Sequence, residues 1–267
     1  MNAPARPSRA QRARSALGLD DLRLWGLVLL LWATTALYVA THLGHRFLGV
    51  PWHPAFDLGT ERGYGEVFFQ MLTGWSILLL VIAAVRRHAG VLFIWAAFTA
   101  YLLADDYFMI HERIGTWFAL NVMYVGRLST HLGEGLWMLT IGILLIVSIA
   151  VAYRLAGPEI RRITIKLGAI YAALVFFGVV VDAIHSPFID VPIIDPIFIA
   201  LEDGGEVAVM SVLVVFLLSL AFPNQDERRV GARDVSRSAK ARSSLGAAAN
   251  RTSGTAASES AQKGSRT

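Results

Sequence analysis

The chain has 267 residues, of which 55% are hydrophobic and only 16% are charged, with a formal net charge of +4. Its mean hydropathy of +0.54 is too high for an ordinary soluble domain. It contains no cysteine, which excludes disulfides and thiolate metal sites, so any bound metal must use oxygen and imidazole ligands. We therefore expect a multi-pass membrane protein whose main partner is the lipid bilayer.

The chain begins with a basic segment, residues 1–21, in which arginines are interspersed with alanine, proline and serine. Such a composition cannot build a core and predicts a disordered cytoplasmic tail. The first long apolar run follows directly. It exceeds the roughly 7–15 residues of a signal-peptide core, and Thr41-His42-Leu43 is a poor cleavage site, so we expect a retained span.

Residues 22–222 contain six segments that are long and apolar enough to cross about 30 Å of hydrocarbon. Backbone groups in lipid must bond internally, and no segment alternates like a barrel strand, so the predicted fold is an all-α bundle of six transmembrane helices. The predicted spans are residues 22–43, 66–85, 91–112, 132–156, 164–185 and 196–222.

The connections between these spans alternate in charge, and residues 223–267 form a second basic tail of low complexity. Arginines and lysines crowd the second and fourth connections, whereas the other connections and their helix ends hold four of the 24 basic residues and 13 of the 20 acidic ones. By the positive-inside rule both termini are cytoplasmic. The tails are typical of topology setting and lipid attraction, so no nucleic-acid partner is expected.

Ionisable residues gather near the outer ends of the last four spans, where their desolvation is costly and normally serves a function. Asp105 and Glu112 are seven residues apart, which would place them on one face of a single third helix. On each of the next three helices two such residues are three or four apart, namely His131 and Glu134, Asp182 and His185, and Glu202 and Glu206. Asp106, His111 and Asp203 are secondary candidates.

Soluble four-helix bundles bind two iron or manganese ions with a carboxylate and a histidine three residues apart on each of two helices. The other two helices supply further carboxylates. Crowded carboxylates in low dielectric repel one another, and a divalent cation relieves this. The pattern therefore indicates a site for zinc, manganese or iron that uses the eight residues above. Shared protons along a proton or cation pathway, or a structural polar network, would also explain it. Single charges such as Asp57 and Asp195 are expected to be solvated loop charges or helix caps.

The chain does not resemble the alkaline ceramidase and adiponectin receptor group, whose members have seven helices and a three-histidine zinc site. The run Asp105-Asp106-x4-His111-Glu112 and the later Glu202-Asp203-x2-Glu206 instead resemble uncharacterised bacterial inner-membrane proteins with an Asp-Glu…His-Glu motif and a late Glu-Glu-x-x-Glu motif. The resemblance covers the last four spans. It implies a location in a bacterial-type cytoplasmic membrane and no known activity.

These observations leave three functional hypotheses open. The first is a metal-dependent membrane hydrolase or oxidoreductase that acts near the extracytoplasmic face on a lipid or small molecule. The second is a transporter or channel for protons or metal cations, although the inner halves of the spans offer almost no acidic residues. The third is a non-catalytic membrane scaffold, which would not need so many ionisable groups in the bilayer.

Overall fold

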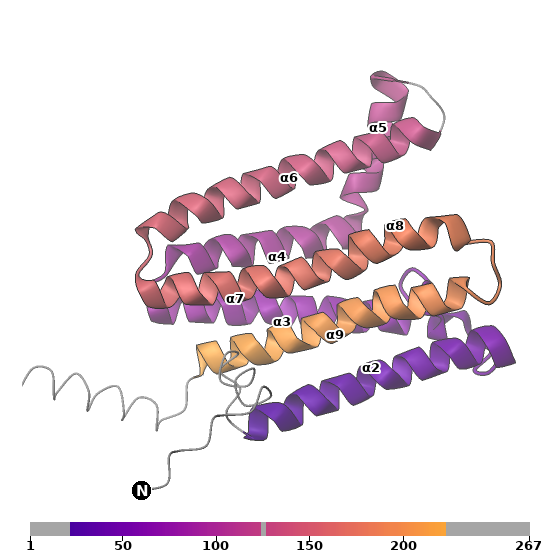
Figure 1. Ribbon diagram of the computed structural model, residues 1–267, viewed down its shortest axis with the longest axis horizontal. Helices are drawn as coiled ribbons and strands as arrows, with labels where there is room; N and C mark the ends of the chain where they lie inside the picture. The colour runs from indigo at the N-terminus through magenta and orange to yellow at the C-terminus, as the bar shows by residue number, and fades with distance from the viewer. Residues whose placement is uncertain (1–21, 124–126, 223–267) are drawn as a thin grey trace, which may run out of the picture. The chain divides into compact units, whose positions relative to one another are not determined.

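The computed structural model describes residues 22–123 and 127–222, and within these ranges it is helical without strands. Six of its helices are long and apolar enough to cross a membrane, which confirms the predicted class of fold (Figure 1). The proposed tails, 1–21 and 223–267, lie outside the described residues. The helices are α2 (Leu22–Leu48), α3 (Tyr64–Arg87), α4 (Gly90–Phe108), α5 (Ile110–Asn121), α6 (Arg127–Leu155), α7 (Pro158–Val175), α8 (Asp182–His185) and α9 (Asp195–Ala221), with short segments η1 (Pro54–Phe56), η2 (Phe176–Val181) and η3 (Ser186–Phe188).

The last helix, α9, is the centre of the packing. It contacts α2, α3, α7 and η2, so it is surrounded by protein on several sides. This fits its sequence, because a helix that is apolar all round has no polar face to offer to water. Leu213, Val215 and Leu217 are completely buried, and they pack in one core with residues of the neighbouring helices such as Leu80 and Leu92.

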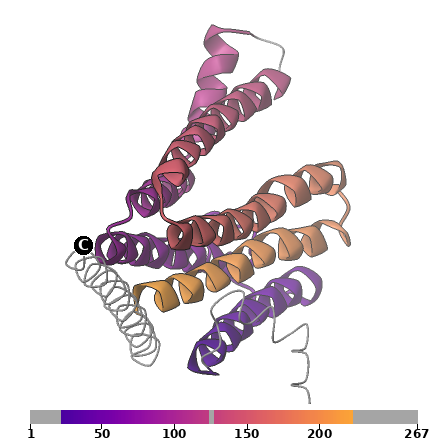
Figure 2. The ribbon, with the colours of Figure 1, turned by 60° about the vertical axis from the view of Figure 1, so that its left-hand side comes forward.

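Helices α5 and α6 form a pair that packs closely together and touches the other helices less (Figure 2). Glycines allow the close approach, since a β carbon at Gly133 would lie 2.9 Å from the Gly115 backbone. The most apolar stretch of α6 has no buried residue. Much of α6 therefore presents apolar side chains outward, as expected for a lipid-facing helix.

The predicted third span, 91–112, is wrong at its C-terminal end. The helix stops at Phe108, Met109 takes a left-handed conformation with φ 53°, and a separate helix α5 begins at Ile110. The physical reason is a side-chain cap, because the Asp105 carboxylate accepts a hydrogen bond from the backbone N–H of His111 at 3.1 Å. Asp105 and Glu112 consequently lie on different helices and do not share the face that their spacing suggested.

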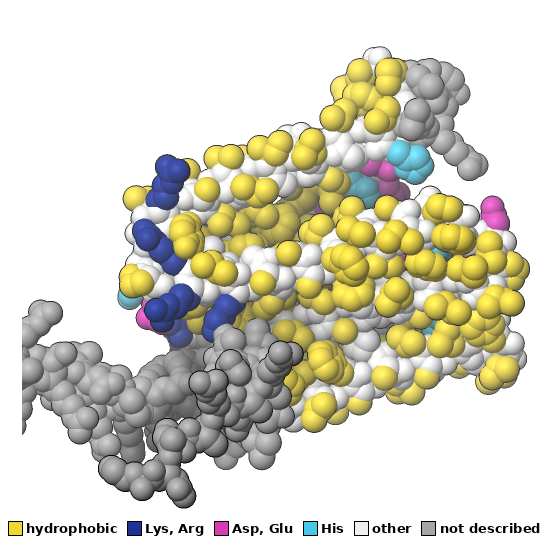
Figure 3. Space-filling model, viewed as in Figure 1, with side chains coloured by type: hydrophobic (Ala, Val, Ile, Leu, Met, Phe, Trp, Pro, Cys, Tyr) yellow, Lys and Arg dark blue, Asp and Glu magenta, His cyan; other side chains and the backbone are white. Residues whose placement is uncertain are grey.

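The two ends of the bundle differ in charge. Lys and Arg side chains gather at the end where α6 and α7 meet, whereas acidic and histidine side chains gather near α5 (Figure 3). At the basic end, Arg86 and Arg87 donate to the carbonyls of Ala221 and Leu220, at 2.7 and 3.3 Å. Basic groups are favourable there because the last carbonyls of a helix carry partial negative charge.

Candidate metal centre

A widened stretch of helix prepares the candidate site. After α7 the chain continues as the π-helical segment η2 and then as α8. A π-helical turn holds one more residue than an α-helical turn, so it rotates the residues that follow, and such turns are frequent at functional sites. A β carbon on Gly178 in η2 would collide with the Glu206 carboxylate, and one on Gly205 in α9 would collide with the Phe177 ring. The two glycines thus let η2 lie close against α9.

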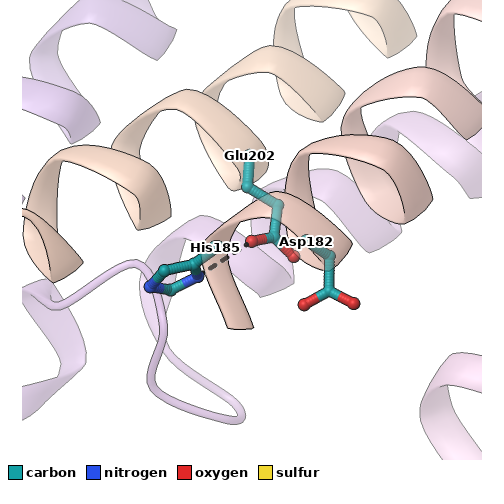
Figure 4. Close-up of side chains that lie close together, drawn as sticks. All are labelled: Asp182, His185 and Glu202. Atoms are coloured by element: carbon teal, nitrogen blue, oxygen red, sulfur yellow. Dashed lines mark ion pairs between the residues drawn. The ribbon is translucent and has the colours of Figure 1, made fainter. Parts of the chain in front are cut away.

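This close packing brings Asp182, His185 and Glu202 together (Figure 4). Each offers one possible ligand atom, and these atoms all lie within 4.8 Å of one another. The Glu202 carboxylate turns toward the imidazole, with its Oε2 atom 3.5 Å from His185 Nδ1. His185 is buried, Glu202 is half-buried and Asp182 is exposed. An imidazole and two carboxylates at this separation can surround one divalent cation.

The other nitrogen of His185 is held by a second carboxylate. His185 Nε2 lies 3.0 Å from Asp195 Oδ1, and the imidazole stacks on the Phe198 ring with centroids 5.4 Å apart. In the tautomer that a bound metal would select, Nε2 donates the hydrogen bond to the Asp195 carboxylate, which can only accept. The Nδ1 lone pair then faces Glu202 and Asp182, which is the arrangement found around metal-bound histidines.

An arginine ties Asp195 to the connection between α2 and α3. Arg46, near the end of α2, pairs with both Asp195 and Asp57, the latter at 3.0 Å. Asp57 Oδ1 in turn lies 3.0 Å from His42 Nδ1, and His42 Nε2 lies 2.9 Å from the Pro196 carbonyl oxygen. Asp57 and Asp195 are only 9% and 5% exposed, so they are not solvated loop charges. The alternative expectation, a helix cap, holds for Asp57, which is the C-cap of η1, whereas Asp195 is the first residue of α9.

A cavity of about 230 Å³ lies between α9, α3, the adjoining ends of α4 and α5, and the connection between α2 and α3. Gln70 bridges two of the acids at its edge, donating to Glu66 at 2.7 Å and to Asp106 at 3.1 Å. Among the described residues, no lysine or arginine forms an ion pair with the cavity's acids. These acids are Glu61, Glu66, Asp106, Glu112, Asp203 and Glu206.

Glu206 lies between the cavity and η2. It lines the cavity, and its carboxylate lies against Gly178 in η2, the segment that leads to Asp182. Besides Asp195, the N-terminal half of α9 carries three carboxylates, Glu202, Asp203 and Glu206. Carboxylates crowded in a low dielectric repel one another, and a bound cation would relieve this.

The remaining candidates form two further pairs. His111 Nδ1 lies 2.7 Å from Asp105 Oδ2, and Tyr101 donates to the same carboxylate at 3.0 Å while accepting from Trp137 at 2.9 Å. On α6, His131 Nδ1 lies 3.1 Å from Glu134 Oε2. The eight predicted ligands thus fall into several groups: Asp182, His185 and Glu202 are together, Glu112 and Glu206 line the cavity, and Asp105, His131 and Glu134 are paired elsewhere.

Arg46 is absent from the residues predicted for the site, and neither Asp195 nor Asp57 has a predicted role there. A weak signal is present in the sequence, because Arg46 is one of very few basic residues at the acidic ends of the helices and Asp195 opens the helix that follows His185. Neither signal indicates which partners meet. That information depends on how the connections fold over the helix ends.

A family model matches most of the chain. It describes a domain of unknown function, DUF8692, and matches residues 24–220, which include all six candidate spans except the last residue of the sixth, Ala221. No curated protein and no solved structure is significantly similar to the chain.

Proposed function

Since the chain belongs to the DUF8692 family, whose description carries no activity, we propose from the site itself that the protein is a membrane-embedded, metal-dependent enzyme. The observation that carries this proposal is the convergence of Asp182, His185 and Glu202, whose ligand atoms lie within 4.8 Å of one another. Structural zinc sites are usually closed by four protein ligands, whereas catalytic sites use three and keep a position for water or substrate. Three ligands therefore favour a reactive site.

The ligand set fits zinc, manganese or iron. One imidazole and two carboxylates offer a nitrogen and oxygen environment that all three ions accept, and Asp195 supplies the partner that such histidines commonly have. A divalent ion held there would acidify a bound water or polarise a substrate oxygen. Glu206, which lines the cavity one turn after Glu202 on α9, is the side chain that would accept the proton.

The site lies near one end of the spans, and we propose that this is the extracytoplasmic end of a bacterial-type cytoplasmic membrane. The charge difference between the two ends supports this, because the basic end belongs in the cytoplasm. Both termini would then be cytoplasmic. A lipid or a small molecule that reaches the outer membrane surface is the substrate class that such a position serves.

Cation transport is the second candidate function, and the acidic cavity favours it as an entry site. Toward the basic end, however, the core contains fully buried leucines, among them Leu80, Leu92 and Leu217. Among the described residues, Glu159 is the one acidic side chain near the basic end, and it pairs with Arg87. The described core thus offers no acidic side chain between the cavity and the basic end, so the enzyme hypothesis fits the arrangement better.

One reconstitution separates the two functions. Proteoliposomes made from a total bacterial lipid extract are supplied with zinc, manganese or iron, and lipid conversion is followed by mass spectrometry while a trapped dye reports cation entry. We expect metal-dependent conversion without cation entry, and we expect His185→Ala to abolish it. Cation entry that His185→Ala blocks, without any conversion, would establish transport instead, and neither signal with any of the three metals would refute the enzyme proposal.

A further inference from the structure

A second feature of the bundle lies on its outward surface between α2, α7 and α9, and extends from Phe177 and Gly205, near the candidate metal centre, toward the basic end. Here a groove with about 570 Å³ of space is lined almost entirely by apolar side chains. Trp32 forms one wall and donates from its indole N–H to the Ala208 carbonyl at 3.2 Å, which ties α2 to α9. The groove is open along α7 because Ala169 and Ala173 have small side chains that leave the space empty.

One end of the groove is basic. Lys166 is among the lining residues, and its ammonium lies 5.9 Å from the centre of the Phe216 ring, near the end of α9. The Cα–Cβ bonds of α7 tilt toward its N-terminus, so this lysine reaches toward the basic end of the bundle. Arg162 lies one turn earlier and therefore on the same face of α7. Within the described residues, neither side chain forms an ion pair with a carboxylate.

The dimensions match one half of a bilayer. From Lys166 to Phe177 at the far end of the groove is 11 residues along the sequence. At about 1.5 Å per residue this is roughly 16 Å, close to half of the ~30 Å hydrocarbon thickness. An acyl chain lying along the alanines would thus end near the middle of the membrane while its phosphate stood beside the two basic side chains.

We propose that this groove is a binding site for an anionic phospholipid of the leaflet at the basic end. The acyl chain would lie over Ala169 and Ala173, and the headgroup phosphate would pair with Lys166 and Arg162. A zwitterionic lipid fills the same space but brings a cation of its own, so the two basic residues select for net negative charge. This site is separate from the metal centre and does not rest on the proposed function.

Native mass spectrometry tests the proposal. The full chain is purified in detergent and equilibrated with equal amounts of phosphatidylglycerol and phosphatidylcholine that carry the same acyl chains. We expect the wild type to retain the anionic lipid preferentially. Lys166→Gln and Arg162→Gln should each lower that preference about fivefold, since one basic residue near a membrane surface contributes about 1 kcal/mol. Arg154→Gln, which removes an exposed arginine at the same end but outside the groove, should leave the preference unchanged.

A groove-filling variant locates the acyl chain. Ala173→Phe should reduce retention of the lipid, whereas Ala100→Phe, in an apolar groove between α3 and α4 without a basic residue, should not. Equal retention of the two lipids by the wild type would overturn the proposal, as would a preference that survives both glutamine variants. A preference that Lys166→Gln removes but Ala173→Phe leaves intact would contradict the position of the acyl chain.

Discussion

His185 is the residue whose environment is most specific, because both of its ring nitrogens face carboxylates. Nδ1 faces the Glu202 side of the triad, whereas Nε2 bonds Asp195 at 3.0 Å. Asp195 cannot be a ligand in this arrangement, since it holds the nitrogen that points away from Asp182 and Glu202. It acts as a positioning residue that fixes the orientation of the imidazole, with Arg46 balancing its charge.

The first prediction concerns this positioning. Asp195→Asn should leave the metal stoichiometry intact but weaken metal affinity about 10- to 100-fold, because the second partner of a metal-bound histidine tunes its basicity and angle. Competition with a chelator of known affinity measures the change. Asp190→Asn is the matched control, as Asp190 is an exposed carboxylate on the connection between α8 and α9. An unchanged affinity in a folded Asp195→Asn protein would show that Asp195 does not act through His185.

Asp105 and Asp106 offer a second contrast at the scale of single residues. Asp105 is buried and accepts from Tyr101 and from the backbone and ring of His111, whereas exposed Asp106 accepts from Gln70. Asp105→Ala should lower the free energy of unfolding by about 2–3 kcal/mol, because it leaves buried donors without a partner. Asp106→Ala should cost less than about 1 kcal/mol.

Titration with a denaturing detergent in mixed micelles measures both changes. Metal content should be unaffected in either variant, because neither aspartate belongs to the triad. Equal stability of the two variants would contradict the capping role of Asp105. Loss of metal from Asp105→Ala alone would show that Asp105 is a metal ligand, as its position in the sequence pattern predicts.

At the scale of elements, the π-helical segment η2 decides whether α8 presents its ligands to α9. The length and apolarity of this segment are enough to predict a membrane span, and the structure has a candidate span here. Nothing in the run FFGVVV, however, predicts that part of the span is a π-helix. The helix break at Met109 could not be predicted from the sequence either. Its cause is the hydrogen bond from the His111 backbone N–H to Asp105, and no proline or glycine marks the position. Spacing rules that assume one uninterrupted helix therefore misplaced Glu112, whereas Asp182 and His185, which share the single turn α8, were paired correctly.

Two glycines on the same span test the importance of η2. Gly178→Ala should destabilise the protein by about 1–3 kcal/mol and weaken metal binding, because the new β carbon would occupy the position of the Glu206 carboxylate. Gly168→Ala on α7 is the control, since nothing lies within 4 Å of the position that its new methyl group would take, and alanine favours a helix by up to about 1 kcal/mol. If both substitutions had the same effect on detergent unfolding, close packing of η2 on α9 would not be needed for stability.

At the scale of the whole molecule, the separation of charge between the two ends sets the expected orientation. Reporter fusions after Arg87 and after Gly157 should score as cytoplasmic, because basic residues crowd these connections. Fusions at Gly59 and Val191 should score as external. An external result at Arg87 would invert the bundle and place the candidate metal centre on the cytoplasmic side.

The class of fold and the general region of the site could be predicted from the sequence, since both depend on composition and on short-range spacing. Which residues come together in the candidate site could not be predicted from the sequence. His131 and Glu134 have the same spacing as Asp182 and His185. Their helix, α6, packs on α5, however, and neither residue belongs to the candidate metal group of the described residues. Which helices face one another is decided by long-range packing, such as the glycine contacts between η2 and α9, and a single sequence does not display it.

The central claim is that Asp182, His185 and Glu202 hold one divalent cation, and the metal content of the purified protein tests it most directly. The protein is stripped with a chelator, reloaded separately with zinc, manganese and iron, desalted, and measured by inductively coupled plasma mass spectrometry. We expect about one ion per chain in the wild type with at least one of the three metals. The ion should be absent from His185→Ala and Glu202→Gln, and it should be retained by His131→Ala, which removes an exposed imidazole outside the triad. A wild type that retains none of the three metals, or a His185→Ala protein that retains as much as the wild type, would contradict the claim.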